Sequence, residues 1–143
     1  MGMFVNPDNS AFQVALNSEI YVDKTGMLEY TNKVINTLQG YICNSRPRRF
    51  GKSVTANMLA AYYSKGCDSR ETLKISESIG FEQNINKYDV IHIDIQWCIE
   101  PAGGSENVVS YITEKTICEL REYYPNELSE KIKSLPEALS VIN

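Results

Sequence analysis

The stretch "ICNSRPRRFGKSVTANML", residues 42–59, combines three features that together predict a fold. It begins with the second half of "LQGYICNS", an apolar piece suited to a buried strand. It then runs through a basic loop into a segment with apolar residues at helical spacing. Its centre, Gly51-Lys52-Ser53, matches the second half of the phosphate-binding (Walker A) pattern G-x-x-x-x-G-K-[ST]. In that pattern the lysine reaches the β- and γ-phosphates and the hydroxyl binds Mg²⁺, so these residues predict a phosphate site.

The loop departs from that pattern at its first position, where Arg46 stands in place of glycine. Arginine does not readily adopt the positive-φ turn that glycine allows, and Pro47 fixes the backbone and removes an N–H donor. Arg48 and Arg49 bring guanidinium donors that suit phosphate oxygens. The residues favour a nucleotide-phosphate site, and they leave open a basic contact with nucleic acid or a plain surface charge cluster.

Strand and helix signals along the rest of the chain predict an α/β fold. The second strand is expected in "KYDVIHIDIQW", residues 87–97, where apolar and polar residues alternate. One helix is expected from an N-cap at Asp23 to residue 35, and another from Ser53 to a stop at Gly66. Further helices are expected within residues 69–81 and over residues 109–120. The last is expected from about Asn126 to residue 142, with a kink or break at Pro136. Strands separated by long helical segments indicate a P-loop NTPase-type parallel sheet with flanking helices.

Composition narrows the class of protein and of partner. The 143 residues carry a formal net charge of −4, so any attraction for phosphates must come from the local basic loop. The four cysteines show no C-x-x-C pair, which argues against a zinc site. The first residues lack the pattern of a signal peptide, and no apolar run approaches membrane-spanning length. We therefore expect a reduced, cytoplasmic protein with no membrane partner.

Two motifs carry a resemblance to a known family. "YVDKT" at residues 21–25, followed by "SRPRRFGKS" at residues 45–53, resembles the bacterial predicted AAA-ATPase-like family of P-loop ATPases, which have an α/β core. In that family R-P-R-R-F-G-K-S is the usual form of the loop, so the resemblance accounts for Arg46. It implies ATP and Mg²⁺ as ligands and a nucleotide-binding set of Arg48, Arg49, Phe50, Gly51, Lys52, Ser53 and Val54.

The resemblance also implies separate roles within that set. Lys52 would contact the β- and γ-phosphates, Ser53 would hold Mg²⁺, and Gly51 would allow close backbone approach. The family's acidic Walker B strand follows a helix that resembles "LPEALSVIN", so that strand is not found in this chain. Asp94 is a weaker candidate for a magnesium role, and the alternative is an aspartate that caps a turn.

These observations lead to one main hypothesis and two alternatives. Two strands cannot bury both faces of a sheet against four helices, so we expect the front part of a larger domain. Residues 1–36 would form a turn and helix leading into the core, and residues 37–143 a partial P-loop ATPase core. The main hypothesis is an ATP·Mg²⁺-binding module, weak or inactive in hydrolysis alone and without an assigned catalytic residue. The alternatives are a nucleic-acid-binding module and a degenerate protein-interaction domain, and an unpaired sheet edge would favour self-association.

Overall fold

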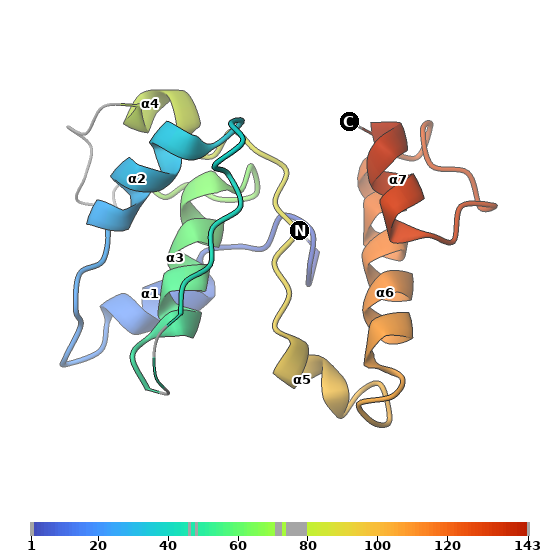
Figure 1. The fold of residues 1–143 in the computed structure, drawn as a ribbon, viewed down its shortest axis with the longest axis horizontal. Helices are drawn as coiled ribbons and strands as arrows, with labels where there is room; N and C mark the ends of the chain where they lie inside the picture. Colours follow the sequence, from blue (N-terminus) through green and yellow to red (C-terminus); the bar gives the residue numbers. More distant parts are fainter. Residues whose placement is uncertain (1, 46, 48, 71–72, 74–79, 143) are drawn as a thin grey trace. The chain divides into compact units, whose positions relative to one another are not determined.

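The structure, a computed structural model, describes residues 2–45, 47, 49–70, 73 and 80–142. These residues form seven helices, and the chain divides into two compact units, Asn6–Val90 and Met1–Val5 with Ile91–Asn143 (Figure 1). Helices α1 (Ser10–Leu16), α2 (Gly26–Val34), α3 (Lys52–Tyr63) and α4 (Phe81–Asn84) belong to the first unit, and α5 (Ile95–Ile99), α6 (Val108–Tyr123) and α7 (Leu135–Ile142) to the second.

The predicted α/β fold with a parallel sheet is wrong. The part of the chain that the structure describes is helical and contains no strand; its β pairing is limited to two isolated bridges, Val5 with Ile91 and Ser64 with Tyr88. The expected first strand, residues 40–45, has no regular secondary structure and no bridge to another described segment, and its Tyr41 side chain is 97% exposed. A strand persists through hydrogen bonds to a neighbour and burial of at least one face. Residues 40–45 have neither, so their apolar composition does not produce a sheet.

The expected second strand fails for a different reason. Residues 87–94 run extended, but Asp94 then turns the chain into helix α5. Its Oδ1 accepts hydrogen bonds from the backbone N–H groups of Gln96 (3.0 Å) and Trp97 (3.4 Å), which makes Asp94 the N-cap. The alternation of apolar residues therefore stops at the cap, and Trp97 is 78% exposed instead of lying on a sheet face.

The core of the unit Asn6–Val90 gathers around α3. Helix α1 packs against α3, and α2 packs against α4 (Figure 1). Buried side chains from all four helices and from two segments beside them form one cluster: Phe12, Leu28, Met58, Ala61, Tyr62, Tyr63, Leu73, Phe81 and Ile85. The contribution of α3 comes mostly from its second half, because its first residues, Lys52 and Ser53, are exposed. Burial of the second half fixes α3 in the unit and leaves its start accessible.

The last residues of α3, together with Ser64, form what we call the capped end, residues 61–64. A helix leaves its final carbonyl groups without intrahelical partners. Here the Asn86 side-chain N–H₂ donates to the carbonyl oxygens of Ala61 (3.0 Å), Tyr62 (3.3 Å) and Ser64 (2.9 Å). The Ser69 hydroxyl also donates to the Ala61 carbonyl oxygen, at 2.8 Å. Asn86 adopts a left-handed backbone, φ 53°, which an asparagine tolerates better than most residues.

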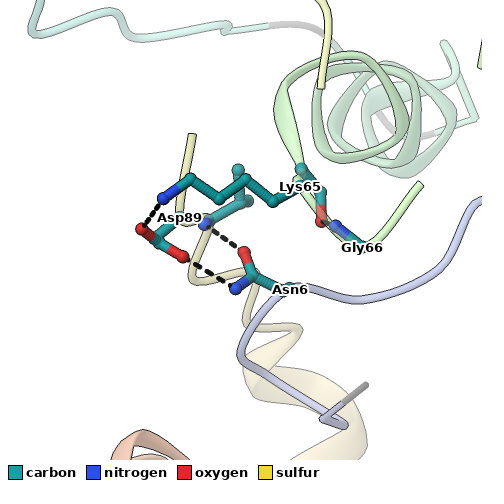
Figure 2. Close-up of polar contacts among 6 residues, drawn as sticks. Asn6, Lys65, Gly66 and Asp89 are labelled. Carbon is teal, nitrogen blue, oxygen red and sulfur yellow. Dashed lines mark hydrogen bonds and ion pairs between the residues drawn. The ribbon is translucent and has the colours of Figure 1, made fainter. Parts of the chain in front are cut away.

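A second asparagine ties the beginning of the same unit to its end (Figure 2). Asn6 is 2% exposed, and its side-chain N–H₂ donates to Asp89 Oδ1 at 2.9 Å. Its side-chain oxygen accepts the backbone N–H of Val90 at 2.8 Å. Asp89 also pairs with the Lys65 ammonium at 2.5 Å, just beyond the capped end of α3. The two ends of the segment 6–90 are therefore held together by the two part-buried hydrogen bonds of Asn6.

The second unit is organised around α6. The Glu119 carboxylate on this helix accepts hydrogen bonds from the backbone N–H groups of residues 3, 4 and 5, at 2.8–2.9 Å. The Arg121 guanidinium donates to the carbonyl oxygens of Ser129, Glu130 and Ile132, which holds the loop before α7. Pro136 lies in the first turn of α7, where its missing N–H costs nothing, so it starts this helix and does not kink a longer one.

Several element boundaries differ from those predicted. The N-cap of α2 is Thr25 and not the expected Asp23. Asp23 lies two residues before the cap, and its Oδ1 accepts a hydrogen bond from the Thr25 backbone N–H at 2.9 Å. Helix α3 ends at Tyr63, before the expected stop at Gly66. Most of the helix expected within residues 69–81 lies outside the described residues. Among the described helices, none has the length and apolar character needed to cross a membrane.

Candidate functional site

The loop before α3 contains two left-handed residues, Arg49 with φ 68° and Gly51 with φ 73°. Glycine adopts this conformation without steric cost, whereas arginine does so under strain. Gly51 is the N-cap of α3, so the chain turns sharply and enters the helix at Lys52. Residues 49–54, which we call the loop end of α3, therefore contain the sharp backbone turn that the Gly-Lys-Ser motif requires.

Hydrogen bonds hold this turn from inside the helix and from the loop. The Gly51 carbonyl oxygen accepts the backbone N–H of Thr55 and its hydroxyl, both at 3.0 Å. The Lys52 ammonium reaches back over the loop and donates to the Pro47 carbonyl oxygen at 3.0 Å. Because the first N–H groups of a helix have no intrahelical acceptor, the start of the twelve-residue α3 offers donors and a partial positive charge. The loop end therefore has the properties of an anion site.

A second lysine contacts the loop from a distant part of the sequence. Lys24, in the YVDKT motif, donates from its ammonium to the Phe50 carbonyl oxygen at 2.6 Å and lies 3.4 Å from that of Gly51. A Cβ atom added to Gly51 would lie 2.6 Å from the same ammonium. Glycine at position 51 thus allows both the left-handed turn and the approach of Lys24. The two motifs of the sequence meet at one place in the structure.

A cleft of about 600 Å³ opens beside this contact. Three segments of the unit Asn6–Val90 surround it: helix α1, the chain from Ser18 to Lys24, and the loop end of α3. Its wall is mainly apolar, and the lining residues are Ala11, Val14, Ala15, Ser18, Ile20, Tyr21, Val22, Lys24, Arg49, Phe50, Gly51 and Val54. This volume lies within the range of small-molecule sites in proteins.

The predicted site residues take different places around the loop end. Arg48 and Arg46 lie outside the described residues. Arg49, Phe50, Gly51 and Val54 line the large cleft. Lys52 lines a smaller pocket of about 200 Å³ on another side of α3, formed with Met27, Ile42, Asn44, Thr55, Ala56 and Leu59. Ser53 is exposed at the second position of the helix. The described members of the set therefore share one end of α3, and all of them except Ser53 line one of these two pockets.

Asp94, the weaker magnesium candidate, has the capping role described for α5, in the other unit. The nearby His92 has its pKa lowered by burial, an effect that the charge of Asp94 partly opposes. Within the described residues, no group of three or more His, Cys, Asp or Glu side chains is arranged to hold a metal ion. The structure thus gives Asp94 a structural explanation, as a helix cap.

Two contributors to the cleft were missed at the level of sequence. Helix α1 was not predicted, because only a turn and the helix from Asp23 were expected within residues 1–36, although Phe12 and Leu16 stand four residues apart, as on one helical face. A start signal was also present, because Asp8 Oδ1 accepts the backbone N–H of Ser10 at 3.0 Å. The contact of Lys24 with the loop carries no such signal, since it joins residues 26 positions apart.

Comparison with known proteins yields one match. A family model described as "Predicted AAA-ATPase" matches residues 10–142, nearly the whole chain. Both motifs around the cleft fall within the matched range. Neither the curated proteins nor the solved structures contain a match to this chain.

Proposed function

The chain belongs to the predicted AAA-ATPase family, as its two motifs indicated, and from this membership we propose that residues 49–54 bind the phosphates of ATP together with Mg²⁺. One observation carries the proposal: a left-handed Gly51 leads directly into a twelve-residue helix that begins with the exposed residues Lys52 and Ser53. Helix N–H groups, the helix dipole and a lysine then act on the same anion.

Charge around the loop end supports this proposal. Arg49 and Lys52 are exposed on the loop and the first turn, and the Lys24 ammonium lies against the loop carbonyl groups. In a protein of net charge −4 this is a local concentration of positive charge. A triphosphate has oxygens enough to accept from several of these donors at once, and charge-assisted hydrogen bonds of this kind are stronger than neutral ones. Arg49 and Lys24 bind and orient the phosphate chain, and Lys52 binds it from the first turn of α3.

The Mg²⁺ that accompanies ATP fits the donor present at this site. Magnesium prefers oxygen ligands and keeps several waters, with phosphate oxygens of the substrate among its ligands. The Ser53 hydroxyl is an exposed oxygen at the start of α3, adjacent to Lys52 in sequence. Ser53 would therefore hold the ion, which when bound neutralises phosphate charge. The proposal concerns binding, because no residue of this chain has been assigned to the hydrolysis step.

Calorimetric titration with ATP·Mg²⁺ tests the proposal, and the two ends of α3 supply a matched pair of variants. Lys52→Ala removes a positive charge at the loop end, and Lys65→Ala removes one just beyond the capped end, where Lys65 pairs with Asp89. We expect Lys52→Ala to weaken ATP binding by about tenfold to a hundredfold, the value of a charge-assisted hydrogen bond. Lys65→Ala should bind as the unaltered protein does.

Two results would count against ATP binding at this loop. One is a protein that binds no ATP, and the other is equal affinity in the unaltered protein and Lys52→Ala. Binding of single-stranded or duplex DNA that weakens steeply with salt, without any preference for nucleotides, would favour the nucleic-acid alternative instead.

A further inference from the structure

We propose that the cleft beside the loop end receives the nucleoside ring of the nucleotide whose phosphates bind residues 49–54. This inference rests on the proposed function and extends it, since it assigns a separate binding site for the base to residues of α1 and of the chain from Ser18 to Lys24. The phosphate motif alone says nothing of where a base would lie.

The cleft is continuous with the loop end. Arg49, Phe50 and Gly51 form part of the cleft wall and part of the loop end at the same time. Lys24 joins them, because its ammonium contacts the Phe50 carbonyl oxygen. A ligand whose phosphates lie at the start of α3 can therefore extend directly into the cleft.

Large apolar side chains around the cleft are unusually exposed. Val14, Ile20 and Val22 are 71%, 87% and 67% exposed, and Phe50 is 60% exposed, although all four are large and apolar. They come from three separate segments and meet around one cleft. Exposed apolar groups scattered singly are ordinary, but a gathering around a concave site indicates a bound partner.

The cleft has a cationic side and an apolar side. Its cationic residues, Lys24 and Arg49, belong to the side next to the loop, whereas α1 contributes Ala11, Val14 and Ala15. A nucleotide has the same division, with a flat weakly polar ring at one end and a polyanion at the other. An apolar peptide or a lipid chain would match the wall from α1 but not the cationic side.

Part of the cleft wall is fixed to the core. The Tyr21 ring meets the Phe12 ring edge-on, with centroids 6.2 Å apart, and Phe12 is fully buried in the cluster around α3. A wall held in this way is preformed, and binding to a preformed surface has a lower cost in conformational entropy.

The experiment compares ATP·Mg²⁺ with inorganic tripolyphosphate·Mg²⁺, which has the phosphate chain but no ring. The cleft variant carries Val14→Ser and Val22→Ser. Its matched control carries Val109→Ser and Val141→Ser, because these valines are also exposed, 72% and 47%, and lie in the other unit. Unfolding of each variant is followed first, to establish that the protein is folded at the titration temperature.

We expect ATP to bind the unaltered protein at least about tenfold more tightly than tripolyphosphate does, from burial of the ring. The cleft variant should lose about fivefold to tenfold in ATP affinity and keep its tripolyphosphate affinity, because only the apolar contact is removed. The control variant should bind both ligands as the unaltered protein does.

The outcomes separate the two proposals. If tripolyphosphate binds as tightly as ATP, or if the cleft variant keeps full ATP affinity, the cleft does not hold the ring, while phosphate binding at the loop still stands. If the cleft variant weakens both ligands equally, the cleft residues act on the loop and not on a ring, which also overturns the inference. If neither ligand binds the unaltered protein, the proposed function and this extension both fail.

Discussion

The two ends of helix α3 are opposites in structure. At the capped end, the Asn86 and Ser69 side chains donate hydrogen bonds to the final carbonyl groups of the helix, and Tyr62 and Tyr63 are buried. At the loop end, Lys52 and Ser53 are exposed, Arg49 is held in a left-handed backbone, and a cleft adjoins the turn. The protein itself supplies the hydrogen-bond donors at the capped end, whereas we propose that the donors at the loop end bind the phosphates of a nucleotide.

If the proposed function is right, one helix stabilises the fold at its capped end and binds a ligand at its loop end. Burial and satisfied hydrogen bonds concentrate at the capped end, so changes there should affect unfolding. The loop end contributes little buried surface, so changes there should affect ligand affinity more than stability. Changes at the two ends of α3 test this difference, and we expect the largest loss of stability at the capped end and the smallest at the loop end.

Asn86→Ala should give the largest loss of stability, about 3 kcal/mol, because it leaves the carbonyl groups at the capped end without their shared donor. It also places alanine at φ 53°, a left-handed conformation that asparagine tolerates better, and this adds backbone strain. Urea unfolding followed by circular dichroism measures the change.

Asn86→Gly serves as the control, since glycine adopts a positive φ freely and lacks the same side chain. A stability loss that disappears in Asn86→Gly would assign the whole effect to backbone strain and contradict the capping role of the side chain.

The capped end should also make the protein sensitive to alkaline pH through Tyr63. Burial raises the pKa of Tyr63 from 10.0 to about 12, although the Thr31 hydroxyl 2.7 Å away opposes the shift. The unfolded chain loses this proton first, so the stability contribution is fully present below pH 10 and is lost as pH rises toward 12. We expect this to remove about 2 kcal/mol over that interval.

Unfolding curves at pH 9 to 11.5 measure this loss in the unaltered protein, in Tyr63→Phe and in Tyr41→Phe. Tyr63→Phe should be less stable at neutral pH but fall less steeply with rising pH. Tyr41, which is almost fully exposed, is the control and should leave the alkaline fall unchanged. An identical alkaline fall in all three proteins is inconsistent with burial of the Tyr63 hydroxyl.

Gly51→Ala should have the smallest effect on stability, about 1 kcal/mol, through the left-handed φ at the loop end. The added Cβ would also displace the Lys24 ammonium from its position 2.6 Å away. ATP affinity should therefore fall in this variant by more than its modest stability loss suggests. Chemical unfolding and ATP titration on the same preparation give both quantities, and unaltered ATP affinity would argue against the role of Lys24 at the loop.

The loop end was the part of the molecule most readable from sequence, because its signal is local. Gly51, Lys52 and Ser53 stand beside each other, and the helix that follows them, Lys52–Tyr63, begins one residue from the expected Ser53. Its left-handed turn follows from the demand of the motif for glycine at position 51.

The fold class was not readable in this way, because a sheet depends on partners distant in sequence. Apolar residues at 40–45 and alternating residues at 87–97 favour strands. They do not show whether another segment pairs with either strand. The capping residue Asn86 and the loop contact of Lys24 were missed for the same reason, since each joins segments more than twenty positions apart.

Amide hydrogen exchange with and without ATP·Mg²⁺ tests the division between the two ends of α3 most directly. We expect slow exchange at residues 61–64 in both conditions, because these residues are buried and hydrogen-bonded. We expect rapid exchange at residues 51–54 without nucleotide and at least about tenfold slower exchange with it, as phosphate oxygens accept from those N–H groups. Unchanged exchange at residues 51–54, or protection by nucleotide at the capped end alone, would contradict this division.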